Sequence, residues 1–239
     1  MSIVENIKSK AESLADVEFS YSITNDFSAI DSLDDDCSAI VVDGTVIYFE
    51  IKNLVLLQKT SKRQAARVYK MYYHALKEVC KETDGYLNCF SPDSFLMVYP
   101  KEKHDLSYVV DTALKIADLF SIKLREPFEK HCHLNFSMGI DHGNILGTKV
   151  ISDGNLQHIA WYGTTIDKAK TIAQKSIRPF YVGVSGTVYH HLNEDLLTTT
   201  KQILGIHKRV EIWERVSYEY DNTKRHLYQT NFHKDFDGQ

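Results

Sequence analysis

Two carboxylates, Glu50 and Asp93, stand where the surrounding sequence makes an acidic side chain unexpected. Glu50 is near the end of TVIYFEIKNL, residues 45–54, which is typical of a strand in which burial would make a charge costly. Asp93 is in SPDSFLMVY, where two β-rich runs meet. Carboxylates brought together repel unless a proton or a cation lies between them, and hard divalent ions prefer such oxygen ligands. The pair indicates a metal site, with a solvent-facing acid or a pairing with lysine as the simpler alternatives for Glu50.

Side chains that could read a flat base accompany this pair. Because a strand alternates with period two, Tyr48 shares a face with Glu50. From the hairpin, Asn88 or one of its neighbours Cys89 and Phe90 lines the same cavity. An aromatic ring and an amide can stack on a base and hydrogen-bond to it. The alternative is that Tyr48 is a core tyrosine and Asn88 an ordinary cross-strand polar residue.

The loop that follows the strand offers a different kind of ligand. Lys52, Asn53 and Leu54 supply backbone N–H groups just before a helix. Such amides, together with a helix N-terminus, can hold phosphate groups.

The elements that must position these residues follow from apolar periodicity and turn residues. Two β-rich runs joined through Pro92 and Asp93 predict a hairpin. The other expected elements are a strand at 38–51 with a turn at Asp43-Gly44, helices at about 61–83 and 105–124, a strand at 133–141, a loop through Gly143 and Gly147, a strand at 157–161, a helix at 164–175, a strand at 180–184, a helix at 185–192 and two extended segments in the tail. This β-α-β-β-α-β order plus one αβ unit predicts an α+β fold, a ferredoxin-like core with an antiparallel-rich sheet and helices on one face.

Composition limits the other possibilities. The chain has 239 residues, 43% hydrophobic and 25% charged, which fits a globular domain of ordinary core size. A net charge of −4 does not suggest nucleic-acid binding, and no apolar run is long enough to cross a membrane. The N-terminal segment has the pattern of a short amphipathic helix. Four scattered cysteines without a CxxC pair favour a reducing cytoplasmic location.

Four segments, in order, resemble the motifs of class III nucleotide cyclases. TVIYFEIKNL is similar to their first strand and phosphate loop, SPDSFLMVY to their metal-binding hairpin, LNFSMGIDHGNILG to their Gly-Ile-His strand, and WYGTTIDKAKTIAQ to their ribose- and phosphate-contacting helix. The run SMGIDHGNILGTKVISDGNLQHIAWYG and the tail segments IWERVSY and LYQTNFHKDF more narrowly resemble the pyrimidine (uridylate or cytidylate) cyclases of bacterial anti-phage Pycsar systems. The resemblance covers about residues 40–235. It implies an N-terminal extension at 1–39, a cyclase-like domain at 40–195 and a C-terminal β extension at 196–239 on the same domain.

The resemblance also implies an activity and its residues. A homodimeric cyclase would convert UTP or CTP to the 3′,5′-cyclic monophosphate and pyrophosphate with two Mn²⁺ or Mg²⁺ ions per site, and the product would act on a separate effector. The metal ligands would be Glu50, Asp93 and the carbonyl of Ile51. Asp167 and Thr171 would complete the catalytic set from the other chain, and the substrate would be bound by Tyr48, Lys52, Asn53, Leu54, Asn88 and Lys170. Purine-reading lysine and aspartate are missing at the corresponding places, which favours a pyrimidine.

Three substitutions depart from that pattern. Glu50 replaces the first metal aspartate, Pro92 replaces the glycine before the second carboxylate, and Asp167 and Thr171 replace an amide and a cation. Lys168 and Lys170 are nearby, as phosphate contacts or as solvated side chains. A protein of this fold that has lost the chemistry, and that binds nucleotide or dimerises as a regulator, is therefore the alternative function.

Overall fold

The computed structural model divides the chain into two compact units, each described here by itself. The small unit holds residues 1–43 and 144–163, and the large unit holds residues 44–143 and 164–239. Two long strands, β2 (Ser38–Ile51) and β5 (Phe136–Ser152), give residues to both units. The structure describes residues 2–16, 18, 20–24, 27–30, 33, 38–133, 135–152, 156–203 and 206–235.

The small unit combines a helix with strand pairs. It contains α1 (Ile3–Asp16), β1 (Ser20–Ile23), the 3₁₀ turn Phe27–Ile30 and β6 (Leu156–Tyr162). β1 runs parallel to the beginning of β2, and β6 pairs antiparallel with the end of β5. None of the residues of α1 is buried. The amphipathic N-terminal helix expected from the sequence is confirmed.

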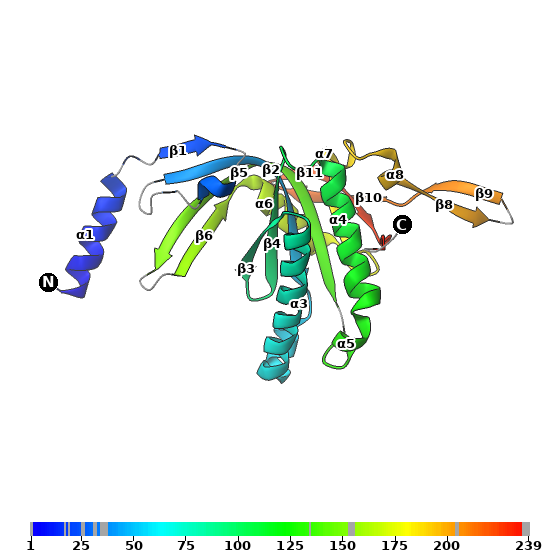
Figure 1. The fold of residues 1–239 in the computed structure, drawn as a ribbon, viewed down its shortest axis with the longest axis horizontal. Helices are drawn as coiled ribbons and strands as arrows, with labels where there is room; N and C mark the ends of the chain where they lie inside the picture. The colour runs from blue at the N-terminus through cyan, green and yellow to red at the C-terminus, as the bar shows by residue number, and fades with distance from the viewer. Residues whose placement is uncertain are drawn as a thin grey trace. The chain divides into compact units, whose positions relative to one another are not determined.

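The large unit is built on a sheet with the order β10-β11-β7-β5-β2-β4-β3 (Figure 1). Its remaining strands are β3 (Tyr86–Ser91), β4 (Ser94–Pro100), β7 (Val182–Ser185), β10 (Glu214–Tyr220) and β11 (Thr223–Thr230). β7 runs parallel to β5, whereas the pairs β2–β4, β3–β4, β7–β11 and β10–β11 are antiparallel. The antiparallel-rich α+β fold and the hairpin turning at Pro92 and Asp93 are confirmed.

Helices and a second hairpin complete the large unit. Ser61 caps α3 by accepting from the Gln64 amide, and Asp105 caps α4 by accepting from the Tyr108 amide. The helices are α2 (Leu54–Thr60), α3 (Lys62–Glu82), α4 (Leu106–Asp118), which continues in a π-type turn at Leu119–Lys123, α5 (Arg125–Glu129), α6 (Thr164–Lys175), α7 (Gly186–Tyr189) and α8 (Glu194–Leu197). β8 (Thr198–Ile203) and β9 (Ile206–Glu211) form a separate two-stranded hairpin.

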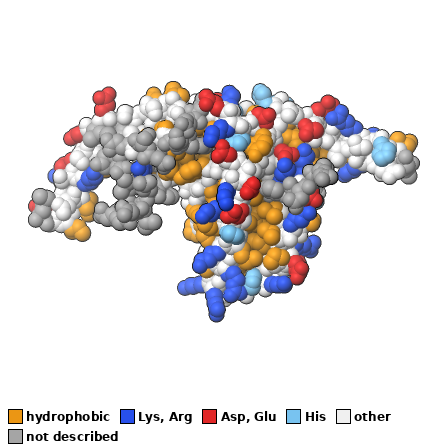
Figure 2. Space-filling model, in the orientation of Figure 1, with side chains coloured by type: hydrophobic (Ala, Val, Ile, Leu, Met, Phe, Trp, Pro, Cys, Tyr) orange, Lys and Arg blue, Asp and Glu red, His pale blue; other side chains and the backbone are white. Residues whose placement is uncertain are grey.

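The main core lies between α3, α4 and one face of the sheet. Phe49 is fully buried at its centre, where its ring stacks on Phe136 at 5.3 Å and also contacts Tyr72 and Phe120. Figure 2 shows hydrophobic side chains gathered over α3 and α4. A mostly apolar groove of about 450 Å³ opens between α3 and the segment formed by the π-type turn and α5.

α6 covers the other face of the sheet, so the expectation of helices on one face only is wrong. Its Ile172 packs with Tyr218 and Leu227 from the β10–β11 hairpin. Glycines at neighbouring positions in β5 and β7, Gly139 and Gly183, allow the close approach of this helix.

Two expected breaks in the strands are absent. β2 continues through Asp43-Gly44, so the turn predicted there is wrong. β5 continues through Gly143 and Gly147, so the predicted loop is wrong as well. The reason at Gly147 is packing, because a Cβ there would stand 2.7 Å from the Trp161 ring, which therefore lies over an extended backbone. The sequence also gave no prediction of α2, α5, α8 or the β8–β9 hairpin.

Within the described residues, no helix is long and apolar enough to cross a membrane. Cys80, Cys89 and Cys132 are free thiols, and Cys37 lies outside the described residues.

Candidate functional site

The end of β2 and the turn of the β3–β4 hairpin lie side by side. Glu50 is paired with Ser94 in the register of β2 and β4. The Ile51 amide donates to the Asp93 carbonyl at 2.8 Å. The backbone therefore brings the two carboxylate residues together, although they are far apart in the sequence.

Their side chains lie on the same face of the sheet as Tyr48. Burial raises the pKa of the Tyr48 hydroxyl, and the negative charges of Glu50 and Asp93 raise it further, whereas a hydrogen bond with Ser94 lowers it. One hydroxyl can respond to both charges only if both carboxylates are near it. Tyr48 is 4% exposed, whereas Glu50 and Asp93 are half-buried.

Each carboxylate already has a partner within the chain. Lys52 Nζ lies 2.8 Å from Glu50 Oε2 and donates to the Ala173 carbonyl at 3.0 Å. The Ser91 hydroxyl donates to Asp93 and also contacts the Ser94 hydroxyl. The lysine pairing considered from the sequence is thus present, and it couples Glu50 to α6.

This donor set fits a hard divalent cation, although it is small. Two half-buried carboxylates and the neighbouring Ile51 carbonyl are oxygen ligands of the kind that Mg²⁺ and Mn²⁺ accept, with water filling the remaining positions. Among the described residues, no cluster of three or more His, Cys, Asp or Glu side chains could hold a metal. A metal here would therefore depend on Glu50 and Asp93 and on the phosphates of a substrate.

The segment predicted to bind phosphate follows β2. The Lys52 amide donates to the Asn135 carbonyl at 2.8 Å, so it is already paired within the chain. The Asn53 side chain is tied to the His133 carbonyl, and Leu54 is buried at the start of α2. The amides of Asn53 and Leu54 stand at the beginning of that helix, where amides lack intrahelical partners.

The register assigns the hairpin residues to faces. Asn88 and Tyr48 are both paired with Leu96 of β4, so the two side chains lie in one row on one face. The Phe90 ring contacts the Tyr48 ring edge-on, with centroids 5.6 Å apart. Cys89 is paired instead with Phe95, on the face that α3 covers. Of the three hairpin residues considered, Asn88 and Phe90 lie on the same side of the sheet as Tyr48. Cys89 lies on the opposite side.

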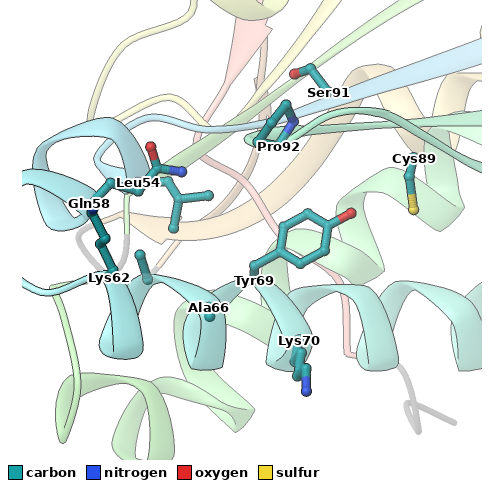
Figure 3. A pocket seen from close by; sticks show the side chains of 10 residues that line it. Leu54, Gln58, Lys62, Ala66, Tyr69, Lys70, Cys89, Ser91 and Pro92 are labelled. Atoms are coloured by element: carbon teal, nitrogen blue, oxygen red, sulfur yellow. The ribbon is translucent and has the colours of Figure 1, made fainter.

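Cys89 lines a separate pocket of about 780 Å³ between α3, the start of α2 and the hairpin (Figure 3). The Tyr69 ring stands at its floor, and burial together with a hydrogen bond to Cys89 raises the pKa of the Tyr69 hydroxyl. Leu54, Ser91 and Pro92 form the side of the pocket next to the hairpin turn.

The residues predicted on the later helix lie on α6. Asp167 is exposed in its first turn, and the Thr171 hydroxyl donates to the Asp167 carbonyl at 2.8 Å. Lys170 is half-buried, while Lys168 turns toward Asp141, with Nζ 3.9 Å from its Oδ2. The hydroxyl hydrogen of Thr171 is thus donated within its own helix.

Sequence reasoning missed three contributors to this site. Ser94 bonds to Tyr48, and the Ala173 carbonyl accepts from both Lys52 and the Ser137 hydroxyl. The position of Lys52 two residues after Glu50 was a signal for the ion pair between them, because residues i and i+2 in a strand share a face.

Comparison with known proteins places this geometry in a known architecture. No protein-family model and no curated protein matches the sequence. Among solved structures, the adenylyl cyclase CyaB from P. aeruginosa has a TM-score of 0.63 at 12% identity, over 80% of this chain and 95% of that chain. A class III adenylyl cyclase-like ATP-binding protein from Pseudomonas aeruginosa has a TM-score of 0.66 at 17% identity, over 81% of this chain and 44% of that one. A dimeric guanylyl cyclase domain from Blastocladiella emersonii has a TM-score of 0.57 at 16% identity, over 82% and 98%. The chain therefore has the fold of the class III nucleotide cyclases.

Proposed function

We propose that this protein is a nucleotide cyclase that converts UTP or CTP into the 3′,5′-cyclic monophosphate and pyrophosphate. The observation that carries the proposal is that Glu50, at the end of β2, lies beside the hairpin turn that holds Asp93, whose carbonyl accepts from the Ile51 amide, in a class III cyclase fold. In the reaction, a bond forms between the 3′-oxygen and the α-phosphorus as the bond to the leaving pyrophosphate breaks.

The chain's own groups would mainly position the substrate. Glu50, Asp93 and the Ile51 carbonyl would hold divalent cations, and the Asn53 and Leu54 amides would face the phosphates. When bound, Mn²⁺ or Mg²⁺ would favour ionisation of the 3′-hydroxyl and neutralise charge on the triphosphate. Lys52 would keep the Glu50 side chain oriented, with one Glu50 carboxylate oxygen shared between the Lys52 ammonium group and the cation. Correct placement of such groups supplies much of the rate enhancement in phosphoryl chemistry.

The proposed base is a pyrimidine, with UTP preferred. Tyr48, Phe90 and Asn88 lie on one face and offer an aromatic wall and an amide, without the lysine and aspartate of purine readers. The similar solved structures are adenylyl and guanylyl cyclases, so the pyrimidine preference rests on these residues and on the motif resemblance. Asp167, Thr171 and Lys170 would reach the substrate from a second copy in a head-to-tail homodimer. In the cytoplasm, the cyclic product would signal phage infection to a separate effector.

The test is product formation. Purified protein is incubated with Mn²⁺ and each of the four ribonucleoside triphosphates, and cyclic products are separated by chromatography and identified by mass. We expect cyclic UMP or cyclic CMP, and a loss of about a hundredfold or more in Asp93→Ala. Glu126→Ala, which removes an exposed carboxylate on α5, is the matched control. Cyclic AMP or cyclic GMP as the main product would overturn the pyrimidine assignment.

A nucleotide-binding or dimerising regulator is the second candidate. Lys52 already offsets the charge of Glu50, Thr171 bonds to its own helix, and one similar structure is of an ATP-binding cyclase-like protein. Nucleotide binding by calorimetry without any cyclic product would favour this candidate over the enzyme.

A further inference from the structure

A second polar pocket opens in the large unit, at the end of β7. β7 ends at Ser185, which is paired with Leu227 of β11, and the chain then turns into α7. β11 continues beyond this pairing toward Arg225. The ending of β7 leaves a pocket of about 270 Å³ beside β11, and its lining is mainly polar. The lining includes Asp141, Lys168, Ser185, Arg215, Arg225 and His226.

The cations of this pocket come from three elements. Lys168 projects from α6, Arg215 from β10 and Arg225 from β11. Arg225 lies over the Tyr220 ring, with 5.6 Å between its guanidinium carbon and the ring centroid. In the part of the chain that the structure describes, no ion pair links Arg215 or Arg225 to a carboxylate. Three cationic side chains and the single carboxylate of Asp141 therefore line the pocket, with Arg225 on the same face of the sheet as Asp141 and Arg215 on the opposite face.

Asp141 is the unusual member of this group. It is 2% exposed, and its carboxyl group accepts hydrogen bonds from Ser185 and from the His142 amide. Its Oδ2 atom is buried without a hydrogen-bond partner among the described residues, and Lys168 Nζ is 3.9 Å away. A buried carboxylate oxygen without a donor is costly, and a ligand that brings a hydrogen would satisfy it.

We propose that this pocket binds an anion of the phosphate class that also carries a hydrogen-bond donor. Arg225 and Lys168 would bind the phosphoryl oxygens from the side of Asp141, and Arg215 would add positive charge from the other face of the hairpin. Guanidinium groups can bind such oxygens in a bidentate manner. Asp141 Oδ2 would accept a hydrogen bond from the remaining O–H group of the anion. The volume lies just below the roughly 300–1,000 Å³ of typical small-molecule sites, which suits one phosphate or the phosphate end of a nucleotide.

Asp141 gives the pocket a selectivity that can be measured. Hydrogen phosphate carries an O–H group, whereas sulfate near neutral pH carries none. A carboxylate oxygen accepts from the first anion and repels the second. Phosphate should therefore bind at least about tenfold more tightly than sulfate, because the mismatch leaves a buried acceptor unpaired beside a like charge.

The experiment is isothermal titration of the full chain at about pH 8 and 0.15 M salt, where non-specific surface binding is screened. Inorganic phosphate is the first probe and sulfate the second. We expect phosphate binding that weakens about tenfold or more in Arg215→Gln/Arg225→Gln and is unchanged in Arg67→Gln, an exposed arginine on α3. Asp141→Asn should narrow the preference for phosphate over sulfate. Thermal unfolding of each variant establishes that it is folded.

Two further titrations identify the kind of molecule that supplies the phosphate group. Titration with pyrophosphate and with UMP shows whether a free anion or a nucleotide binds more tightly, and either order supports the site. Absence of phosphate binding, equal binding of sulfate by the unmodified protein, or full binding in the double arginine variant would each overturn the proposal. The outcome is independent of cyclase activity, because none of the substituted residues belongs to the proposed catalytic set.

Discussion

The close seating of α6 on the sheet predicts a large effect from one methyl group. A Cβ added at Gly139 would lie 1.9 Å from the Ala169 carbonyl oxygen and 2.5 Å from the Ala173 amide nitrogen. The first distance falls about 1.5 Å short of the 3.4 Å at which ordinary contact begins. Both atoms are helix backbone, so no side chain can turn away. Gly139→Ala must therefore displace α6, and overpacking of this kind costs about 3 kcal/mol.

Urea and thermal unfolding measure this cost. For a chain of this length, about 3 kcal/mol corresponds to a fall in Tm of roughly 6–12 °C. Gly186→Ala is the matched control, because among the described residues the nearest atom reported beside its added Cβ is the His226 carbonyl oxygen, 3.9 Å away. We expect the control to change the Tm by no more than a few degrees. If the two variants unfold at the same temperature, α6 does not rest on Gly139 as described.

Three other substitutions test separate parts of the structure. Phe49→Ala should cost about 3–5 kcal/mol in urea unfolding, whereas Phe90→Ala, at a side chain that is 37% exposed, should cost much less. Burial raises the pKa of the Asp141 carboxyl group, so this group binds its proton more tightly in the folded state than in the unfolded state. The protonated carboxyl group therefore contributes stability below the unfolded-state pKa. This contribution is lost as the pH rises through the folded-state pKa. Asp141→Asn should therefore gain stability relative to the unmodified protein as the pH rises above the ordinary aspartate pKa of about 4 in urea titrations; no gain would contradict this. Lys52→Met should tighten Mn²⁺ binding severalfold in calorimetry, because the ammonium group no longer competes for Glu50; unchanged binding would show that this carboxylate is not a ligand.

The sequence predicted best where local patterns act alone. Ser61 and Asp105 marked helix starts, and the dipeptide Pro92-Asp93 marked a tight turn, because caps and turns depend on a few adjacent residues. It failed at Asp43-Gly44 and Gly147, where glycine was interpreted as a break. At Gly147 the ring of Trp161, distant in sequence, occupies the space of the missing side chain. A single sequence contains no direct sign of such tertiary packing.

In the candidate site, too, local patterns in the sequence predicted some positions, whereas positions that depend on tertiary contacts could not be predicted. Period-two alternation predicted that Tyr48 shares a face with Glu50, and the register bears this out. The roles proposed for these residues stay predictions. The tie from Lys52 to α6 could not be foreseen, since it depends on where a helix more than a hundred residues later comes to rest.

The hydrogen bond from Lys52 to the Ala173 carbonyl links the packing of α6 on Gly139 to the carboxylate pair of Glu50 and Asp93. α6 rests on Gly139, and its Ala173 carbonyl accepts from Lys52, which in turn holds Glu50. The Ser137 hydroxyl donates to the same carbonyl at 2.7 Å, so the position of this oxygen is fixed from the sheet as well. A shift of α6 by about 1.5 Å would exceed the tolerance of these hydrogen bonds. Gly139→Ala should therefore loosen the hold of Lys52 on Glu50 as well as the core, and, like Lys52→Met, it should tighten Mn²⁺ binding even at temperatures where the protein remains folded.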